Sequence, residues 1–371
     1  MTKFTGDIGD SEECLKPDVT MYSKNDIIPE VPIIEASFAR MQMFIELKLS
    51  ANSDPFCDGS DEGLSEHDTI LGNQTRGQSL LYAAGQLAYQ HRLFAFSLLI
   101  FGNKARFIRW DREGAVVSAA IDYSKRPHII VEFFRRFNQL TREQLGLDPT
   151  AVPATPEETR MFDAAVAKID IESLKLTTGH KSTYPRFKLE VRGLDDTASH
   201  YIVGRALDYY LDLVSRSTRG FLALDISTQE CVFLKDMWRP DVPGVEPEHV
   251  WYQKLIDAGV PNLVEFKHGS DVVQATPPKH YHGRIPLDRT ETTSLEGAQQ
   301  GLTHRLASLF NIPNLSLQGR VHYRLVQLEL CRPLLEFKGS KHLVSVILDS
   351  LEGWRSQHRN FIATLMSYLT L

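Results

Sequence analysis

A proline- and threonine-rich stretch near the middle of the chain divides the sequence into two halves. This stretch, "GLDPTAVPATPEETR" from Gly146 to Arg160, carries three prolines and three threonines and interrupts the apolar patterns on either side. A chain of 371 residues is also longer than a single hydrophobic core usually serves. The sequence therefore predicts two folding units with a boundary close to residue 150.

The first half alternates short apolar stretches with amphipathic segments. Helical spacing of apolar residues predicts helices over 77–92 and 128–140. Residues 1–150 are therefore expected to form an α/β unit. Strands are predicted over 16–22, 41–50, 93–102, 104–112 and 115–123.

The second half reads as strands first and helices last. We expect residues 151–197 to be a linker with a connecting helix, and residues 198–371 to form an antiparallel sheet with helices. The overall fold class expected is therefore α+β or α/β. Strands are predicted over 184–193, 199–207, 219–226, 230–238, 263–269 and 320–330, and helices over 244–259, 292–310 and 341–361.

Composition indicates the environment in which the chain is expected to work. A net charge of −6 gives the whole chain no basic excess, so nucleic-acid binding is expected, if at all, only through the first unit. The longest apolar run, 93–102, is about half the length of a membrane-spanning helix. The four cysteines lie far apart without a Cys-x-x-Cys pair, which is typical of a reducing compartment. We therefore expect an intracellular protein, cytoplasmic or nuclear, without membrane contact.

Two neighbouring strands of the first unit carry a possible metal-dependent catalytic group. Asp18 follows a proline at the head of one strand, and Glu46 and Lys48 lie two residues apart on the next, so they share a face. Two carboxylates can hold Mg²⁺ while a lysine activates the attacking water. The structural alternative is ordinary, because Glu-x-Lys is common on amphipathic strands and Pro-Asp at turns.

These residues resemble the motif of the PD-(D/E)XK nuclease fold, in which a Pro-Asp is followed by a Glu-x-Lys on the next strand. The resemblance implies a nuclease-like mixed sheet and assigns Asp18 and Glu46 to the metal and Lys48 to the reaction. Gln86, on the following predicted helix, is the candidate for a further polar residue of such a site.

A second constellation lies beyond the proline-rich stretch. Lys235 lies within the apolar strand "VFLKDMW", and Glu248 lies in the first turn of the next predicted helix. Kinases use such a pair, because the strand lysine contacts nucleotide phosphates and the helix glutamate holds that lysine. The upstream turn "SRSTRG" contains a single glycine, Gly220, for close approach of phosphate. A strand lysine that only extends its charge to solvent is the structural alternative.

Several separated motifs resemble the fungal-type protein kinase family. They run in order from about Pro17 to Phe361 and include "RFIRWDREGAVVS", "LGLDPT", "STRGFLALD", "VFLKDMWR", "GVPNL" and "HYRLVQLELCRPLLEF". The resemblance implies a kinase-like N-lobe, serine/threonine phosphorylation, and use of ATP and Mg²⁺. It assigns nucleotide contact to Lys235, Glu248 and Gly220, with residues 328–337 as the hinge.

The matched sequence also departs from that family in two places. Ser215 and Ser217 stand where its phosphate loop usually has glycines, so weak ATP binding is expected. The family continues from the helix after the hinge into His-Arg-Asp-Ile-Ser, but here the residues that follow Phe361 contain no His, Asn or charge. The tripeptide 358–360, His-Arg-Asn, falls within the helix and before that loop.

No catalytic residue for kinase chemistry is therefore assigned. We expect a missing C-lobe and a truncated or pseudokinase form. The alternatives are the Mg²⁺-dependent nuclease activity and a non-catalytic interaction module. The sequence does not identify a protein partner or substrate.

Overall fold

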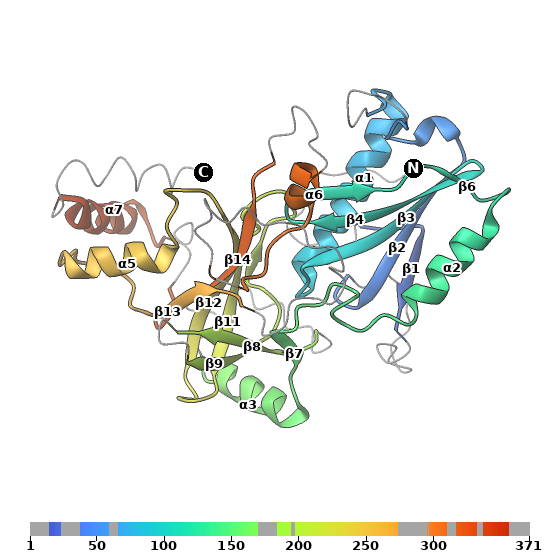
Figure 1. Cartoon of the computed structure of the whole chain (residues 1–371). Coiled ribbons are helices and arrows are strands. Elements are labelled where there is room, and N and C mark those ends of the chain that lie inside the picture. Colours follow the sequence, from blue (N-terminus) through green and yellow to red (C-terminus); the bar gives the residue numbers. More distant parts are fainter. Residues whose placement is uncertain are drawn as a thin grey trace.

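The chain folds around two β-sheets that lie side by side (Figure 1). The computed structural model describes residues 15–23, 38–58, 66–169, 184–193, 197–273, 295, 297–309, 317–331 and 337–355. This arrangement confirms the expected α+β organisation with two sheets.

The first sheet is mixed and has helices on both faces. Its strand order is β1-β2-β3-β4-β5, with β6 beside β4. Among the described strands of this sheet, only β2 and β3 are paired in parallel, and helix α1 makes the crossover between them. The elements are β1 (Val19–Tyr22), β2 (Met41–Lys48), η3 (Ala51–Ser53), α1 (Ile70–Tyr89), β3 (Phe94–Phe101), β4 (Lys104–Asp111), β5 (Gly114–Val117), β6 (Ile121–Asp122) and α2 (Pro127–Phe137).

Burial on both faces explains the long apolar run of β3. Leu99 packs on the α1 side with Phe44 and Tyr82. Its neighbour Leu98 packs on the opposite side with Phe137 of α2. Because successive side chains of a strand alternate between faces, a strand covered on both faces needs apolar residues at nearly every position.

The second sheet is antiparallel throughout. Its order is β13-β14-β12-β11-β9-β8-β7, with β10 beside β11. The sheet curls until β8 approaches β13, where Ser270 Oγ donates a hydrogen bond to the Arg192 carbonyl at 2.8 Å. The elements are β7 (Ala151–Pro153), α3 (Pro156–Val166), β8 (Phe187–Arg192), β9 (Ala198–Val203), β10 (Asp208–Tyr209), β11 (Arg219–Asp225), β12 (Cys231–Pro240), α5 (Glu248–Asp257), β13 (Phe266–Asp271), α6 (Thr303–Leu309), β14 (Arg320–Gln327) and α7 (Ser340–Arg355).

The segment 151–197, expected as a linker with a connecting helix, contributes two strands and a helix to the second unit. Strand β7 pairs with β8, and β8 pairs with β9. Helix α3 begins with a capping box, in which Thr155 Oγ1 accepts from the Glu158 N–H and the Glu158 carboxylate accepts from the Thr155 N–H. Of the three prolines that suggested a break, Pro149 lies in a turn, Pro153 ends β7, and Pro156 takes the first helical position of α3.

The helix expected over 292–310 is shorter in the structure. It begins at Thr303, and Ala298 and Gln300 instead form bridges to extended segments. Two glycines explain the difference. Gly297 has a φ of +78°. A Cβ at Gly301 would lie 2.0 Å from the Glu113 carboxyl carbon.

Carboxylates of the first sheet hold the start of α6. Asp111 accepts from the N–H groups of Leu302 and Thr303 at 2.9 and 3.1 Å. Glu113 accepts from the His304 N–H at 2.9 Å and from the Arg320 N–H, at the start of β14, at 2.8 Å. These bonds satisfy amide groups at a helix N-terminus that have no partner within the helix.

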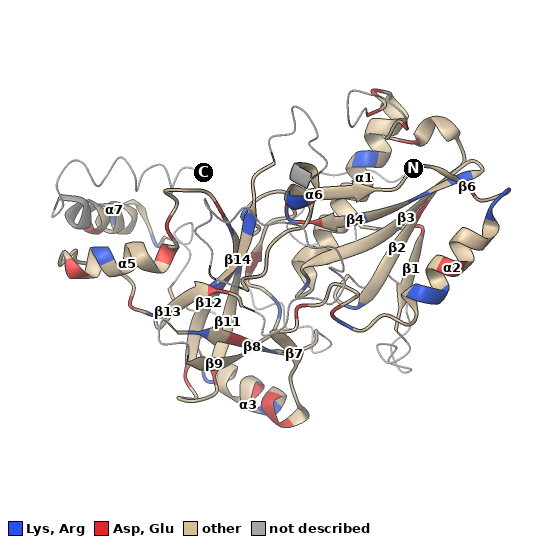
Figure 2. Cartoon of the chain, in the orientation of Figure 1, with Lys and Arg blue, Asp and Glu red and all other residues tan. Residues whose placement is uncertain are grey.

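No helix in the described part of the chain is long and apolar enough to cross a membrane. Figure 2 shows acidic and basic residues on α2, α3 and α5, which lie at the outside of the molecule.

Candidate functional site

Strand β12 and helix α5 bring Lys235 and Glu248 together. The Lys235 Nζ donates to both carboxylate oxygens of Glu248, at 2.9 and 2.7 Å. Both side chains are about a quarter exposed, so the pair remains accessible from solvent. A strand lysine held by a helix glutamate in this way can present its ammonium group to an anion.

A hydrogen bond and apolar packing fix the start of α5 against the second sheet. Its His249 N–H donates to the hydroxyl of Tyr323 on β14 at 3.0 Å. Met237, Tyr323 and Leu325 form a small buried cluster against which Tyr252 of α5 packs. This packing fixes the position of Glu248 relative to strand β12, and therefore its distance from Lys235.

A pocket of about 360 Å³ opens beside this ion pair. Its size falls within the range of about 300–1,000 Å³ that is usual for small-molecule sites. Charged and apolar side chains both line it, as an amphipathic ligand would require. They include Arg216, Lys235, Glu248, Trp251, Leu255 and Leu263.

Gly220 is part of strand β11 and lies directly opposite Lys235 in the strand register. A Cβ atom there would lie 2.7 Å from the ring of Phe233. The glycine therefore allows the Phe233 ring to pack over the sheet. Its assignment to nucleotide contact remains a prediction.

Several hydrogen bonds hold the turn before β11. Ser217 has a φ of +44°, and its Oγ accepts from Arg112 at 2.9 Å and donates to the Asp212 carbonyl at 3.1 Å. The Ser217 N–H donates to Ser215 Oγ at 3.0 Å. Arg112 is buried and belongs to the β4–β5 turn, so the first unit holds this turn of the second.

The structure also brings Asp18, Glu46 and Lys48 together. Asp18 lies just before β1, and its Oδ2 accepts from the N–H of Leu47 on β2 at 2.8 Å. The Lys48 Nζ donates to Glu46 Oε1 at 2.5 Å and to Gln78 Oε1 at 2.8 Å. The second oxygen of Glu46 is buried and has no hydrogen-bond partner within the described ranges.

Burial raises the pKa of Glu46; the hydrogen bond and charge of Lys48 oppose this effect, and the charge of Asp18 reinforces it. Burial likewise raises the pKa of Tyr82, whose hydroxyl accepts from Gln78 at 2.8 Å, to about 12. No three His, Cys, Asp or Glu side chains are grouped for a metal ion within the residues that the structure describes. A divalent ion here would have two protein carboxylates as ligands.

The candidate Gln86 does not belong to this group. Its side-chain amide donates to the carbonyls of Met41 and Gln42, both at 3.0 Å, and is fully buried. Gln78, two turns earlier on α1, contacts Lys48 instead. The expectation for Gln86 was wrong because the register of α1 on β2 cannot be read from spacing alone.

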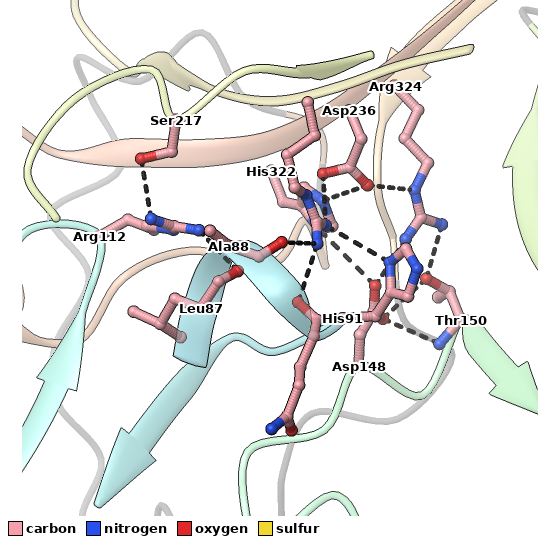
Figure 3. A network of polar contacts seen from close by, with 12 residues as sticks. Leu87, Ala88, His91, Arg112, Asp148, Thr150, Ser217, Asp236, His322 and Arg324 are labelled. Atoms are coloured by element: carbon pink, nitrogen blue, oxygen red, sulfur yellow. Dashed lines mark hydrogen bonds and ion pairs between the residues drawn. The ribbon is translucent and has the colours of Figure 1, made fainter. Parts of the chain in front are cut away.

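Sequence reasoning missed a buried charge network where the two sheets meet (Figure 3). Asp236 of β12 accepts from Arg219 at 2.9 Å and from Arg324 of β14 at 3.0 Å. Asp148 accepts from the other end of Arg324 at 2.6 Å. His322 lies between the two carboxylates, 3.1 Å from Asp236 and 3.8 Å from Asp148.

The network extends to the end of α1. Arg219 donates to the carbonyl of Gln90 at 2.8 Å and contacts His91. Burial, reinforced by the charge of Arg219, lowers the pKa of His91 well below its usual value. Gln299 completes the group, with its amide donating to Asp148 at 2.8 Å.

A signal for this network was present in the sequence. Asp236 and Arg324 are charged residues at inward positions of apolar strands, where a charge requires a partner. The sequence gives no indication of which carboxylate meets which arginine, since Asp148 and Arg324 are far apart along the chain. The carboxylates and arginines of the network come from four of the quoted motifs: "LGLDPT", "STRGFLALD", "VFLKDMWR" and "HYRLVQLEL".

Three of the sequence expectations fall outside the described residues. They are the tripeptide 358–360, the residues 332–336 of the expected hinge, and the segment that follows residue 361.

Residues 73–362 match the family model described as "Fungal protein kinase". The match covers well over half of the chain and includes Lys235, Glu248 and the buried network. It begins beyond Asp18, Glu46 and Lys48. No curated protein and no solved structure matches the chain.

Proposed function

Because the chain belongs to the fungal protein kinase family, we propose that its second unit binds ATP beside Lys235 and Glu248. The observation that carries the proposal is the ion pair between these residues at the edge of the pocket. The ammonium group of Lys235 would contact phosphate oxygens, and Glu248 would keep it in position. Magnesium, which the family implies, would neutralise phosphate charge when it is bound with the nucleotide.

Phosphoryl transfer needs groups beyond this pair. A kinase uses an Asp in a His-Arg-Asp segment to accept the substrate hydroxyl proton, and an Asp-Phe-Gly Asp to hold Mg²⁺. Neither tripeptide occurs in these 371 residues. The proposal for this polypeptide is therefore limited to nucleotide binding.

Millimolar ATP with Mg²⁺ is expected to raise the Tm of the protein by about 3 °C, because ligand binding stabilises the folded state. Lys235→Ala should abolish this shift. Lys188→Ala is the matched control, since Lys188 of β8 also pairs with a helix glutamate, Glu158 at 2.7 Å, away from the pocket. Differential scanning fluorimetry measures all three proteins. Equal shifts in wild type and Lys235→Ala would exclude Lys235 from binding, and no shift in wild type would remove the proposal.

A second candidate function is metal-dependent cleavage of nucleic acid by the first unit. It is favoured by the unpartnered buried oxygen of Glu46, which lies beside Lys48. Asp18 and Glu46 would hold Mg²⁺, and Lys48 would orient the attacking water.

This candidate predicts cleavage of DNA or RNA that requires Mg²⁺ and disappears in Lys48→Ala. Such a loss would be of the order of a hundredfold or more, as for a group that acts in proton transfer. Lys104→Ala, at the start of β4, is the control with a lysine of the same sheet. The readout is gel electrophoresis of labelled oligonucleotides with Mg²⁺ or EDTA. Cleavage that survives in Lys48→Ala would come from a contaminant.

A further inference from the structure

The turn before β11 brings a second cation to the pocket beside Lys235. The side chain of Arg216 lines the same pocket as Lys235 and Glu248. Its backbone is fixed to β12, because the Arg216 carbonyl accepts from the Trp238 N–H at 2.7 Å. The guanidinium therefore extends from a main chain that already has a defined position at the pocket.

The next residue fixes the same turn from the other side. Ser217 is buried, has a positive φ, and is bonded to Arg112 of the first unit. Arg112 is fixed in turn, since it also donates to the carbonyls of Leu87 and Asp212 at 2.8 and 3.2 Å. A turn held by both units is pre-organised, which lowers the entropic cost of ligand binding.

This turn differs from a glycine-rich phosphate loop in how it can bind an anion. Such loops approach phosphate with free backbone N–H groups. Here the Ser217 N–H is bonded to Ser215 Oγ. That amide is therefore already occupied, whereas a guanidinium side chain can form two parallel hydrogen bonds to phosphate oxygens.

The charged side chains that line the pocket include one more cation than carboxylates. Three cationic and two carboxylate side chains line it. Glu248 is bonded to Lys235, and Glu246, the second carboxylate, is bonded to Lys254. The third cation, Arg239, pairs with the buried Asp271 at 2.7 Å and serves the fold.

We infer that Arg216 binds the terminal phosphates of the nucleotide together with Lys235, and so replaces the glycine-rich loop. The inference rests on the proposed ATP binding. It assigns to Arg216 the discrimination between a nucleoside triphosphate and a monophosphate, because only the triphosphate extends beyond Lys235.

The test is isothermal titration calorimetry of the full chain with ATP and with AMP. Wild type is expected to prefer ATP, and Arg216→Ala should weaken ATP binding about tenfold or more while changing AMP binding less than about twofold. Arg216→Lys should recover part of the affinity, because a lysine keeps the charge but not the bidentate geometry. Arg160→Ala, on the exposed surface of α3, controls for loss of a positive charge elsewhere.

The outcomes separate this inference from the proposed function. If Arg216→Ala binds ATP as wild type does while Lys235→Ala does not, the inference fails and ATP binding stands. If Arg216→Ala weakens the binding of ATP and of AMP equally, the residue supports the pocket without distinguishing the number of phosphates, which also overturns the inference. If wild type binds neither nucleotide at millimolar concentration, both fail. Near-ultraviolet circular dichroism of each variant verifies that the fold is intact.

Discussion

Replacing Asp236 with Asn is expected to lower the free energy of unfolding by about 3–5 kcal/mol. Asp236 is buried and lies within 3.1 Å of Arg219, Arg324 and His322. Asn has the same shape, so the change removes charge without creating a cavity. The two arginines would then remain buried with one carboxylate fewer, and an uncompensated buried charge is costly. Urea unfolding monitored by circular dichroism measures the difference.

The effect of Asp236→Asn should depend on pH in a defined direction. Burial alone would raise the pKa values of Asp236 and Asp148. Nearby charges outweigh burial and lower both values: Arg219 and His322 act on Asp236, and Arg324 and His322 act on Asp148. The pKa of Asp148 falls to about 2. The stability from each group is complete above the ordinary pKa of 3.8 and is lost as the pH falls through the lowered value. The gap between wild type and Asp236→Asn should therefore narrow below pH 3.8.

His91 adds a loss of stability at milder acidity in both proteins. Its pKa in the folded protein lies well below the ordinary value of 6.5, so it is neutral there. Unfolding takes up a proton below pH 6.5, and the free energy of unfolding falls from that pH downward.

Asp163→Asn is the control for Asp236→Asn. Asp163 pairs with Arg186 at 3.1 Å, but its side chain is 51% exposed, and such pairs contribute at most about 1 kcal/mol. If the free energy of unfolding falls by a similar small amount in both variants, the buried network contributes little to stability, and packing alone holds the two sheets together.

Gly146→Ala is expected to destabilise the protein by about 3 kcal/mol or more. Gly146 has a φ of +92°, and an added Cβ would lie 2.1 Å from the carbonyl oxygen of Phe94. The backbone cannot move away easily, because the Gly146 carbonyl accepts from the Leu93 N–H at 2.8 Å. Backbone strain of about 1–3 kcal/mol therefore adds to a similar cost of displacing β3.

A second glycine separates these two contributions. Gly259, after α5, has a φ of +67° and nothing within 4 Å of the position of an added Cβ. Gly259→Ala should therefore cost only the strain of the left-handed conformation, about 1–2 kcal/mol. Thermal unfolding of both variants tests the argument. A cost for Gly146→Ala no greater than that for Gly259→Ala would mean that the contact with Phe94 relaxes freely.

The local parts of the candidate sites could be predicted from the sequence. The pairing of Lys235 with Glu248 follows from a lysine on a strand and a glutamate at the start of the next helix. Glu46 and Lys48 share a face because they are two residues apart on one strand. In both cases a short spacing along the chain determines the contact.

Other parts depend on contacts between distant segments. A helix was expected within 151–197, and α3 lies there, but the pairing of β7 with β8 and of β8 with β9 depends on the rest of the second sheet. The network of Asp148, Asp236 and Arg324 could not be derived, since which strands meet at the junction is a property of the whole fold. The prediction for Gln86 was wrong for the same reason, because the carbonyls that it contacts belong to a strand far earlier in the sequence.

The carboxylates of Asp111 and Glu113 affect whether one half of this chain can fold without the other. They belong to the first sheet, yet they complete the hydrogen bonds of α6 and β14 in the second. A fragment cut near residue 150 would leave these amides unsatisfied in one piece and two buried acids exposed in the other. The boundary predicted from the sequence should therefore not separate two independent unfolding units, and we expect the two sheets to unfold in one cooperative transition.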